Sequence, residues 1–197
     1  MADDPLLEAA LAHHRQPHRT YHDQRHVLEL LDLARVHAPD LTPAERLAIL
    51  FHDAVYVPGA PKGQNEALSA LLMRASLFAL ARDGTIAAVE PSSVDDADAI
   101  IAATAHAEPP PPPAARMCDL DLWRLAAPWD DFVRHGEDIR REYRFLHTSD
   151  AAFWTARRAF YRGMLEKPAI FATPYFHDRF EAQARANLQR AADATVP

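Results

Sequence analysis

Two residue types that commonly bind metals stand side by side at positions 52 and 53, where His52 is followed directly by Asp53. The pair lies in the run Arg46–Tyr56, whose apolar residues recur at helical spacing. Adjacent side chains on a helix point about 100° apart, so one ion placed between them could be held by both. Polar groups buried in such a run cost free energy unless they are paired or bind a metal. The pair therefore predicts a metal site, provided that other segments supply further ligands.

Two other segments offer such ligands. Upstream, His26 shares a helical face with His22 and Leu30, so we expect it on the side that enters the core. Downstream, Asp119 and Asp121 are acids embedded in an apolar stretch. Side chains two positions apart on a helix point roughly 200° apart, so these two acids cannot both face one ion.

The order of these residues, a histidine, then the adjacent His-Asp pair, then an acid, resembles the HD-domain metal-dependent phosphohydrolases. The chain is also similar to a bacterial branch of small predicted HD phosphohydrolases of comparable length. The stretches that carry the second resemblance cover most of residues 18–190; they are His18-Arg-Thr-Tyr-His22 with His26, Phe51-His-Asp-Ala-Val-Tyr56, Asn65-Glu66-Ala-Leu-Ser69-Ala70, Asp119-Leu-Asp-Leu122, Ile139-Arg-Arg-Glu-Tyr143 and Ala184-Arg-Ala-Asn-Leu188.

The resemblance implies an all-α, HD-type helical domain that holds one or two divalent ions in a helix-lined pocket. Its metal ligands would be His26, His52, Asp53 and one acid of the 119–121 stretch. The superfamily acid tends to open a helix and to follow a small or apolar residue, which favours Asp121 and leaves Asp119 as the alternative. A mixed imidazole and carboxylate site suits Mn, Fe, Co, Ni or Zn, with Mg less expected.

The activity that the resemblance implies is hydrolysis of a phosphoester of a small molecule, with a nucleotide as one candidate, by water activated at the metal. Asp53 would act at the metal, while Glu66 or His106 would transfer a proton or hold a second ion. Arginines would neutralise charge on the phosphoryl oxygens, because their planar fork binds such oxygens in pairs. The arginine candidates are Arg19, Arg25, Arg140 and Arg144.

Each of these residues also has a structural interpretation. His26 could be a core histidine bonded to a carbonyl, His106 could cap a helix end, and Glu66 could be an ordinary acid of a first helical turn. Arg140 could belong to a salt-bridge network. Arg185 and Asn187 are expected to pin the last helix. His13 and His14 are expected to be exposed or simply to pack, with no pattern that suggests a role.

Three alternative functions stay open beside phosphoester hydrolysis. An HD-type domain could bind metal without hydrolysis and serve as a sensor or an interaction module. The same ligands could hold two irons and support an oxygenase reaction, as in some HD relatives. The chain could also be a helical bundle without any metal.

The bulk composition bounds the class of protein. The 197 residues suit a single domain over 1–197, and only 5 glycines with few β-branched runs favour helix throughout. A net charge of −7 argues against non-specific nucleic-acid binding, which needs a basic face. We expect a cytoplasmic protein outside the membrane, for three reasons. The sequence has a single cysteine, Cys118, it has no apolar run of membrane length, and it shows no leader peptide. The expected partner is a small phosphorylated substrate, and a homo-oligomer is left open.

The spacing of apolar residues and capping signals predicts most helices. Thr42 and Glu45 form a capping box at the start of the helix that carries the His-Asp pair, which we expect to end near Tyr56. The run Pro109–Pro113 is expected to be non-helical, within a flexible loop over 108–114. The other expected helices cover 5–15, the stretch after His22, 65–81, 93–104, a short helix from Asp119, 130–145, 150–165 and 177–192.

Overall fold

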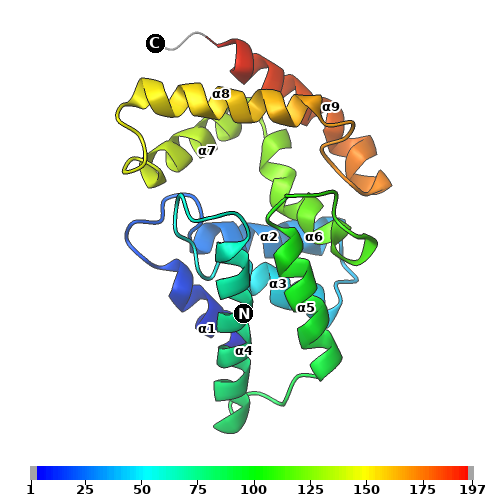
Figure 1. Cartoon of the computed structure of the whole chain (residues 1–197). Coiled ribbons are helices and arrows are strands. Elements are labelled where there is room, and N and C mark those ends of the chain that lie inside the picture. Colours follow the sequence, from blue (N-terminus) through cyan, green and yellow to red (C-terminus); the bar gives the residue numbers. More distant parts are fainter. Residues whose placement is uncertain (1–3, 195–197) are drawn as a thin grey trace. The chain divides into compact units, whose positions relative to one another are not determined.

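The computed structural model describes residues 4–194, and every regular element among them is a helix (Figure 1). This confirms the all-α prediction, and none of the described helices is both long and apolar enough to span a membrane. The elements are α1 (Pro5–His14), α2 (Gln24–His37), α3 (Pro43–Phe51), α4 (Gln64–Arg82), α5 (Pro91–Ala103), α6 (Pro112–Leu122), the 3-10 helix η1 (Trp123–Ala126), α7 (Trp129–Glu142), α8 (Asp150–Glu166) and α9 (Pro174–Asp193).

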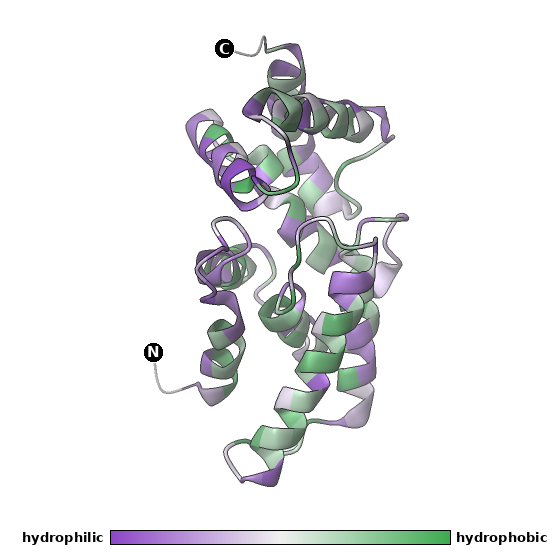
Figure 2. Cartoon of the chain, turned by 60° about the vertical axis from the view of Figure 1, so that its left-hand side comes forward, coloured by the Kyte–Doolittle hydropathy of each residue, from purple (hydrophilic) through white to green (hydrophobic). Residues whose placement is uncertain are grey.

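The chain groups into two compact units, one up to Met117 and one from Cys118 onward. In the first unit α3 is the central helix, and α1, α2, α4 and α5 all contact it or one another. Its residues from Leu47 to Phe51 are almost completely buried, as expected of a helical segment that is apolar on all sides. The longer helices mix apolar and polar residues on the same ribbon, which Figure 2 shows as green and purple stretches.

The first turn of α3 is stabilised as its sequence predicts. Thr42 and Glu45 form the expected capping box, which satisfies backbone amides that have no partner within the helix. Glu45 is 5% exposed, and its carboxylate also accepts two hydrogen bonds from Arg116. Although burial alone would raise the pKa of Glu45, the hydrogen bonds from Arg116 and Thr42 lower it below its usual value.

The other end of α3 differs from the prediction. The helix ends at Phe51 rather than near Tyr56, and His52 is its C-terminal cap. The amide of Ala54 bonds to the carbonyl of Phe51, which closes a tight turn. The expectation that both His52 and Asp53 lie within the helix is therefore wrong, since both residues lie beyond its last residue, Phe51. The pair lies where the chain leaves the helix.

The proline-rich connector is also shorter than predicted. Helix α6 begins at Pro112, so Pro112 and Pro113 are helical and the helix starts seven residues before Asp119. The physical reason is that the first amides of a helix need no intrahelical acceptor, so proline is tolerated in the first turn. The non-helical part of the predicted loop 108–114 ends at Pro111.

In the second unit α8 and α9 lie side by side, and η1 and α7 complete the packing (Figure 1). Asn187 is buried on α9 and donates hydrogen bonds to the carbonyls of Leu125 and Ala127, at 2.9 and 2.8 Å. Arg185 bonds to Glu181 and to three backbone carbonyls at the end of α8 and just beyond it. Both residues therefore pin the last helix, as the sequence predicts. Helix α9 begins at Pro174, three residues before the expected start.

Candidate metal centre

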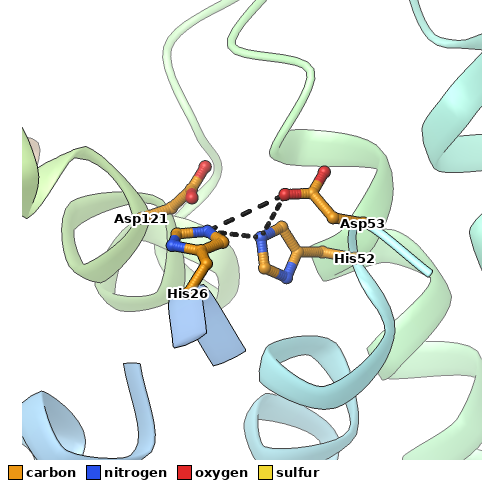
Figure 3. A group of neighbouring side chains, drawn as sticks. All are labelled: His26, His52, Asp53 and Asp121. Atoms are coloured by element: carbon orange, nitrogen blue, oxygen red, sulfur yellow. Dashed lines mark hydrogen bonds and ion pairs between the residues drawn. The ribbon is translucent and has the colours of Figure 1, made fainter. Parts of the chain in front are cut away.

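Three of the predicted ligands converge in the first unit. The Nε2 atoms of His26 and His52 lie 3.2 Å apart, and Asp53 Oδ2 lies 3.1 Å from His52 Nε2 and 3.7 Å from His26 Nε2 (Figure 3). All three residues are buried, with 1, 1 and 8% of their surface exposed. His26 comes from the first turns of α2, whereas the His-Asp pair lies at the end of α3.

The backbone of α3 orients the imidazole of His52. Its Nδ1 atom lies 3.2 Å from the carbonyl oxygen of Ala48 and 3.3 Å from that of Ile49. Because carbonyls only accept hydrogen bonds, Nδ1 carries the proton and Nε2 presents its lone pair. Histidines that bind metals are usually held by such a bond from the other ring nitrogen.

The fourth member of the group is Asp121 on α6. Each of the four residues offers one ligand atom, and these atoms all lie within 4.8 Å of one another (Figure 3). Ligands bound to one ion at about 2.1 Å are roughly 3.0 to 3.5 Å apart when they subtend angles near 90° to 110°. The distances of 3.1 and 3.2 Å fall in that range and the distance of 3.7 Å is slightly longer. The spacing of His26, His52 and Asp53 therefore suits a divalent ion, and two imidazoles with two carboxylates also suit its charge.

The alternative acid, Asp119, is used by the backbone of the second unit. It is 1% exposed, and its carboxylate accepts hydrogen bonds from the amide of Ala172 and from the amide and hydroxyl of Thr173. Burial raises the pKa of Asp119, and these hydrogen bonds oppose the rise. The group of potential ligands contains Asp121 and not Asp119. Of the two acids that the sequence left open, the structure therefore favours Asp121.

Helix α4 holds the chain that follows the His-Asp pair. Ser69 Oγ accepts a hydrogen bond from the amide of Val55 and donates one to its carbonyl, at 3.0 and 3.2 Å. Asn65 does the same for Val57, at the same two distances. Ser69 is completely buried. These contacts explain the stretch Asn65-Glu66-Ala-Leu-Ser69, which carries the resemblance but whose chemistry the sequence did not reveal.

Aromatic rings pack beside the ligands. The ring of His22 stacks on Tyr56, with centroids 3.7 Å apart and an angle of 22° between the planes. The His22 ring also lies 6.2 Å from the ring of His26, edge to face. Both His22 and Tyr56 are half-buried. His22 is therefore a packing neighbour of a candidate ligand.

Two further catalytic candidates, Glu66 and His106, are outside the four-residue group. Glu66 lies half-buried in the first turn of α4, the place where an acid is favoured by the helix dipole. His106 lies three residues beyond the end of α5, with a φ of 48°. This left-handed conformation is uncommon outside glycine and occurs more often for histidine than for most residues. The catalytic roles of both residues stay predictions.

Arg140 lies in a salt-bridge network of the second unit. It bonds to Glu137 at 2.8 Å and to Asp150 at 2.9 Å, which ties the end of α7 to the start of α8. These hydrogen bonds raise the pKa of Arg140 further above its already high value. Arg144 lies beyond the end of α7, with its guanidinium 4.6 Å from the centre of the Phe145 ring. The network matches the structural interpretation of Arg140.

The two arginines of the first unit also bind protein groups. Arg25 is bonded to Asp23 at 2.7 Å and to the carbonyl of Thr20 at 2.8 Å. Arg19 is 5% exposed and donates its hydrogen bonds mainly to backbone carbonyls. Because the guanidinium of Arg19 already binds these carbonyls, its contacts differ from those of the phosphate-binding arginine that the sequence suggested.

His14 is the residue near this site that sequence reasoning missed. It is completely buried, and its Nε2 lies 3.2 Å from the carbonyl oxygen of Leu50 on α3. Burial is the main reason that its pKa falls from 6.5 to about 3, with the positive charge of Arg19 adding to the decrease. The signal was present in the sequence, because His14 continues the apolar face of Leu7 and Leu11 at helical spacing.

Comparison of the chain with protein-family models, with curated proteins and with solved structures gave no match. The resemblance to HD-domain proteins therefore depends on the ordered motifs alone, and the metal group depends on the geometry of its own side chains.

Proposed function

We propose that this protein is an HD-type metal-dependent phosphohydrolase that acts on a small phosphorylated molecule, with a nucleotide as one candidate. The ion would be held by His26, His52, Asp53 and Asp121. Mn, Fe, Co, Ni and Zn are the favoured metals for this ligand set, and Mg is less favoured. When bound, such an ion would lower the pKa of a water molecule and polarise a phosphoryl oxygen.

The observation that carries the proposal is the convergence of ligand atoms on one point. Two imidazole Nε2 atoms lie 3.2 Å apart, with a carboxylate oxygen 3.1 Å from the second of them. Nε2 of His52 bears a lone pair because Nδ1 faces carbonyls. The lone pair of His52 Nε2 and the negative oxygen of Asp53 repel each other, and a cation bound between them would offset that repulsion. In the order in which they occur along the chain, these residues also match the motif of the HD proteins.

The surroundings of the ligand residues would help to hold the ion in place. Asp53 lies at the negative end of the α3 dipole, where an acid is unfavourable unless a cation compensates it. A divalent ion there would be stabilised by the helix end and by the carboxylate together. The bond of His52 to the backbone keeps its imidazole from rotating, so the ion would be held in one geometry.

The test combines metal analysis with an activity screen. Protein purified without chelators should contain a divalent metal at a fixed ratio to the chain, measured by mass spectrometry of the elements. It should hydrolyse at least one compound among an aryl phosphate, nucleotides and phosphosugars when Mn, Co, Ni, Zn, Fe or Mg is added. We expect His26→Ala and Asp53→Ala to lose the metal and the activity together.

His177→Ala is the matched control, because it removes an exposed histidine that pairs only with its neighbour Asp178 among the contacts described. It should keep both the metal and the activity. A wild-type protein without any divalent metal, or one whose metal content is unchanged in Asp53→Ala, contradicts the proposal. Oxygen consumption with iron in place of hydrolysis would identify the oxygenase alternative.

A second candidate function is a metal-binding module without hydrolase activity, acting as a sensor or an interaction protein. The observation that favours it concerns the four predicted phosphate-binding arginines. Arg25 and Arg140 are in ion pairs, Arg19 binds backbone carbonyls and Arg144 covers a phenylalanine ring. Stoichiometric metal with no turnover of any phosphorylated compound would support this module over the enzyme.

A further inference from the structure

Arg19 lies between α1 and α2 and uses its guanidinium as a multiple backbone donor. Nη1 donates to the carbonyls of His22 at 3.1 Å and Asp53 at 2.5 Å, and Nη2 donates to the carbonyl of Ala54 at 3.0 Å. Nε donates to Gln16 at 3.1 Å. Only 5% of its surface is exposed, so Arg19 is a buried cation.

The three carbonyls belong to the two segments that carry the metal ligands of the first unit. His22 is followed by the N-cap of α2, and His26 lies four residues further on. Asp53 is itself a candidate ligand, and Ala54 follows it at the end of α3. One planar group therefore joins the chain that enters α2 to the chain that leaves α3.

The C-terminal end of α3 gives this contact its strength. The last carbonyls of a helix have no partner within the helix and carry partial negative charge. Arg19 binds two carbonyls just beyond that end, and His14 lies within hydrogen-bonding distance of the carbonyl of Leu50, the last residue but one of the helix. His14 Nδ1 lies 3.5 Å from Arg19 Nη1, so the imidazole of His14 also contacts the guanidinium of Arg19.

We infer that Arg19 is a positioning residue of the metal centre, which sets the distance between His26 and the His52-Asp53 pair by binding the backbone of both segments. This inference depends on the metal binding that the proposed function includes. It replaces the substrate-binding role that the sequence suggested for Arg19. A lysine keeps the charge but has no planar fork, so it cannot donate to the three carbonyls with the same geometry.

The test measures metal affinity in Arg19→Lys by titration with Co²⁺, whose visible absorption also reports the ligand geometry. Arg185→Lys is the matched control, because Arg185 also donates to three backbone carbonyls but lies in the second unit. Both variants are measured at a temperature at which circular dichroism shows them folded. We expect Arg19→Lys to bind Co²⁺ about 10- to 100-fold more weakly with an altered spectrum, as for other residues that support metal ligands.

Arg185→Lys should lower the melting temperature but leave Co²⁺ affinity within about twofold of the wild type, a difference worth less than 0.5 kcal/mol. Equal affinities in Arg19→Lys and the wild type would overturn the inference. If Arg19→Lys does not fold, His14→Gln is the deciding variant, because it removes the support behind Arg19; an unchanged affinity and spectrum would then overturn the inference.

The outcome for Arg19 is distinguishable from the outcome for the proposed enzyme. A protein that binds Co²⁺ through an Arg19-dependent site but hydrolyses nothing disproves the enzyme and keeps the inference. If the wild type is an active enzyme and Arg19→Lys binds Co²⁺ as tightly as the wild type, the inference is disproved and the proposed enzyme is kept. A wild type that binds no divalent ion overturns both.

Discussion

Thr173 gives both its amide and its hydroxyl to one oxygen of Asp119, at 2.8 and 2.6 Å. The other oxygen of Asp119 accepts the amide of Ala172, and Glu181 accepts the two preceding amides, those of Ile170 and Phe171. Two buried carboxylates thus bind four consecutive backbone amides just before α9. Asp119 holds the chain in this way, although it lies only two residues from a candidate metal ligand.

We predict opposite effects for the two acids of α6. Asp119→Asn should lower the free energy of unfolding by about 1–3 kcal/mol, because an amide cannot accept all three hydrogen bonds equally well. It should leave metal affinity nearly unchanged. Asp121→Asn should weaken metal binding at least about tenfold with a smaller effect on stability. Urea denaturation and metal titration measure the two quantities, and a larger loss of metal affinity in Asp119→Asn would reverse the assignment.

His14 should make the protein sensitive to acid. Its pKa is about 3 in the folded state, below the usual 6.5, because burial disfavours its charged form. Between these two values His14 is protonated in the unfolded chain but neutral in the folded chain. The free energy of unfolding therefore decreases as the pH falls from about 6.5 towards 3. At pH 5 the loss from this residue is about 2 kcal/mol.

His14→Gln provides the comparison, since glutamine does not titrate. Denaturation at pH 7 and pH 5 should show a smaller decrease in the variant than in the wild type, whatever their stabilities at pH 7. Equal decreases in the two proteins would show that His14 is charged in the folded state or titrates normally.

Ser69 should be important for stability out of proportion to its size. Ser69→Ala leaves the amide and the carbonyl of Val55 without the bonds that the hydroxyl supplies, and the site is buried. We expect a loss of about 1–3 kcal/mol in the free energy of unfolding. Asn65→Ala removes the equivalent pair at Val57, but these bonds are exposed to water, so the loss should stay below about 1 kcal/mol. Similar losses in both variants would contradict this argument.

Cys118 should be unreactive in the folded protein. Burial raises the pKa of its thiol from 9.0 to about 12, and the negative charges of Asp121 and Asp119 add to the increase. Since the thiolate is the reactive form, alkylation by iodoacetamide at pH 8 should be about a thousandfold slower than for an exposed thiol. Guanidinium should restore the ordinary rate. Fast labelling of the native protein would show that the thiol is accessible.

The sequence was sufficient to predict the ligands that lie on apolar faces. His26 is on the inward face that periodicity indicated, and His52 closes an apolar helix, so both are buried next to each other. These residues could be found because core-facing position follows from local spacing alone. The all-α class follows for the same reason, since nearly every helix carries its own capping or periodic signal.

Contacts between distant parts of the chain could not be predicted in this way. Two of the backbone carbonyls that Arg19 binds belong to residues 34 and 35 positions away, and carbonyls are identical in every residue type. A sequence therefore shows the donor but not its acceptor. The same holds for Asp119, whose partners are amides more than 50 residues downstream. The end of α3 at Phe51 was missed because residues 52–56 contain no glycine or proline to signal it.

The side chains of Asn65 and Ser69 act on residues 55–57 as a neighbouring β-strand would, since each pairs with both the amide and the carbonyl of one residue. The match is geometric: one helical turn of four residues rises about 6 Å, close to the length of two residues of extended chain. The register between helix and segment is therefore set, and a one-residue deletion between Val55 and Val57 would leave Asn65 and Ser69 unable to bind both residues at once. The loop over 58–62 lies outside this register, so changes in its length should leave the metal ligands where they are.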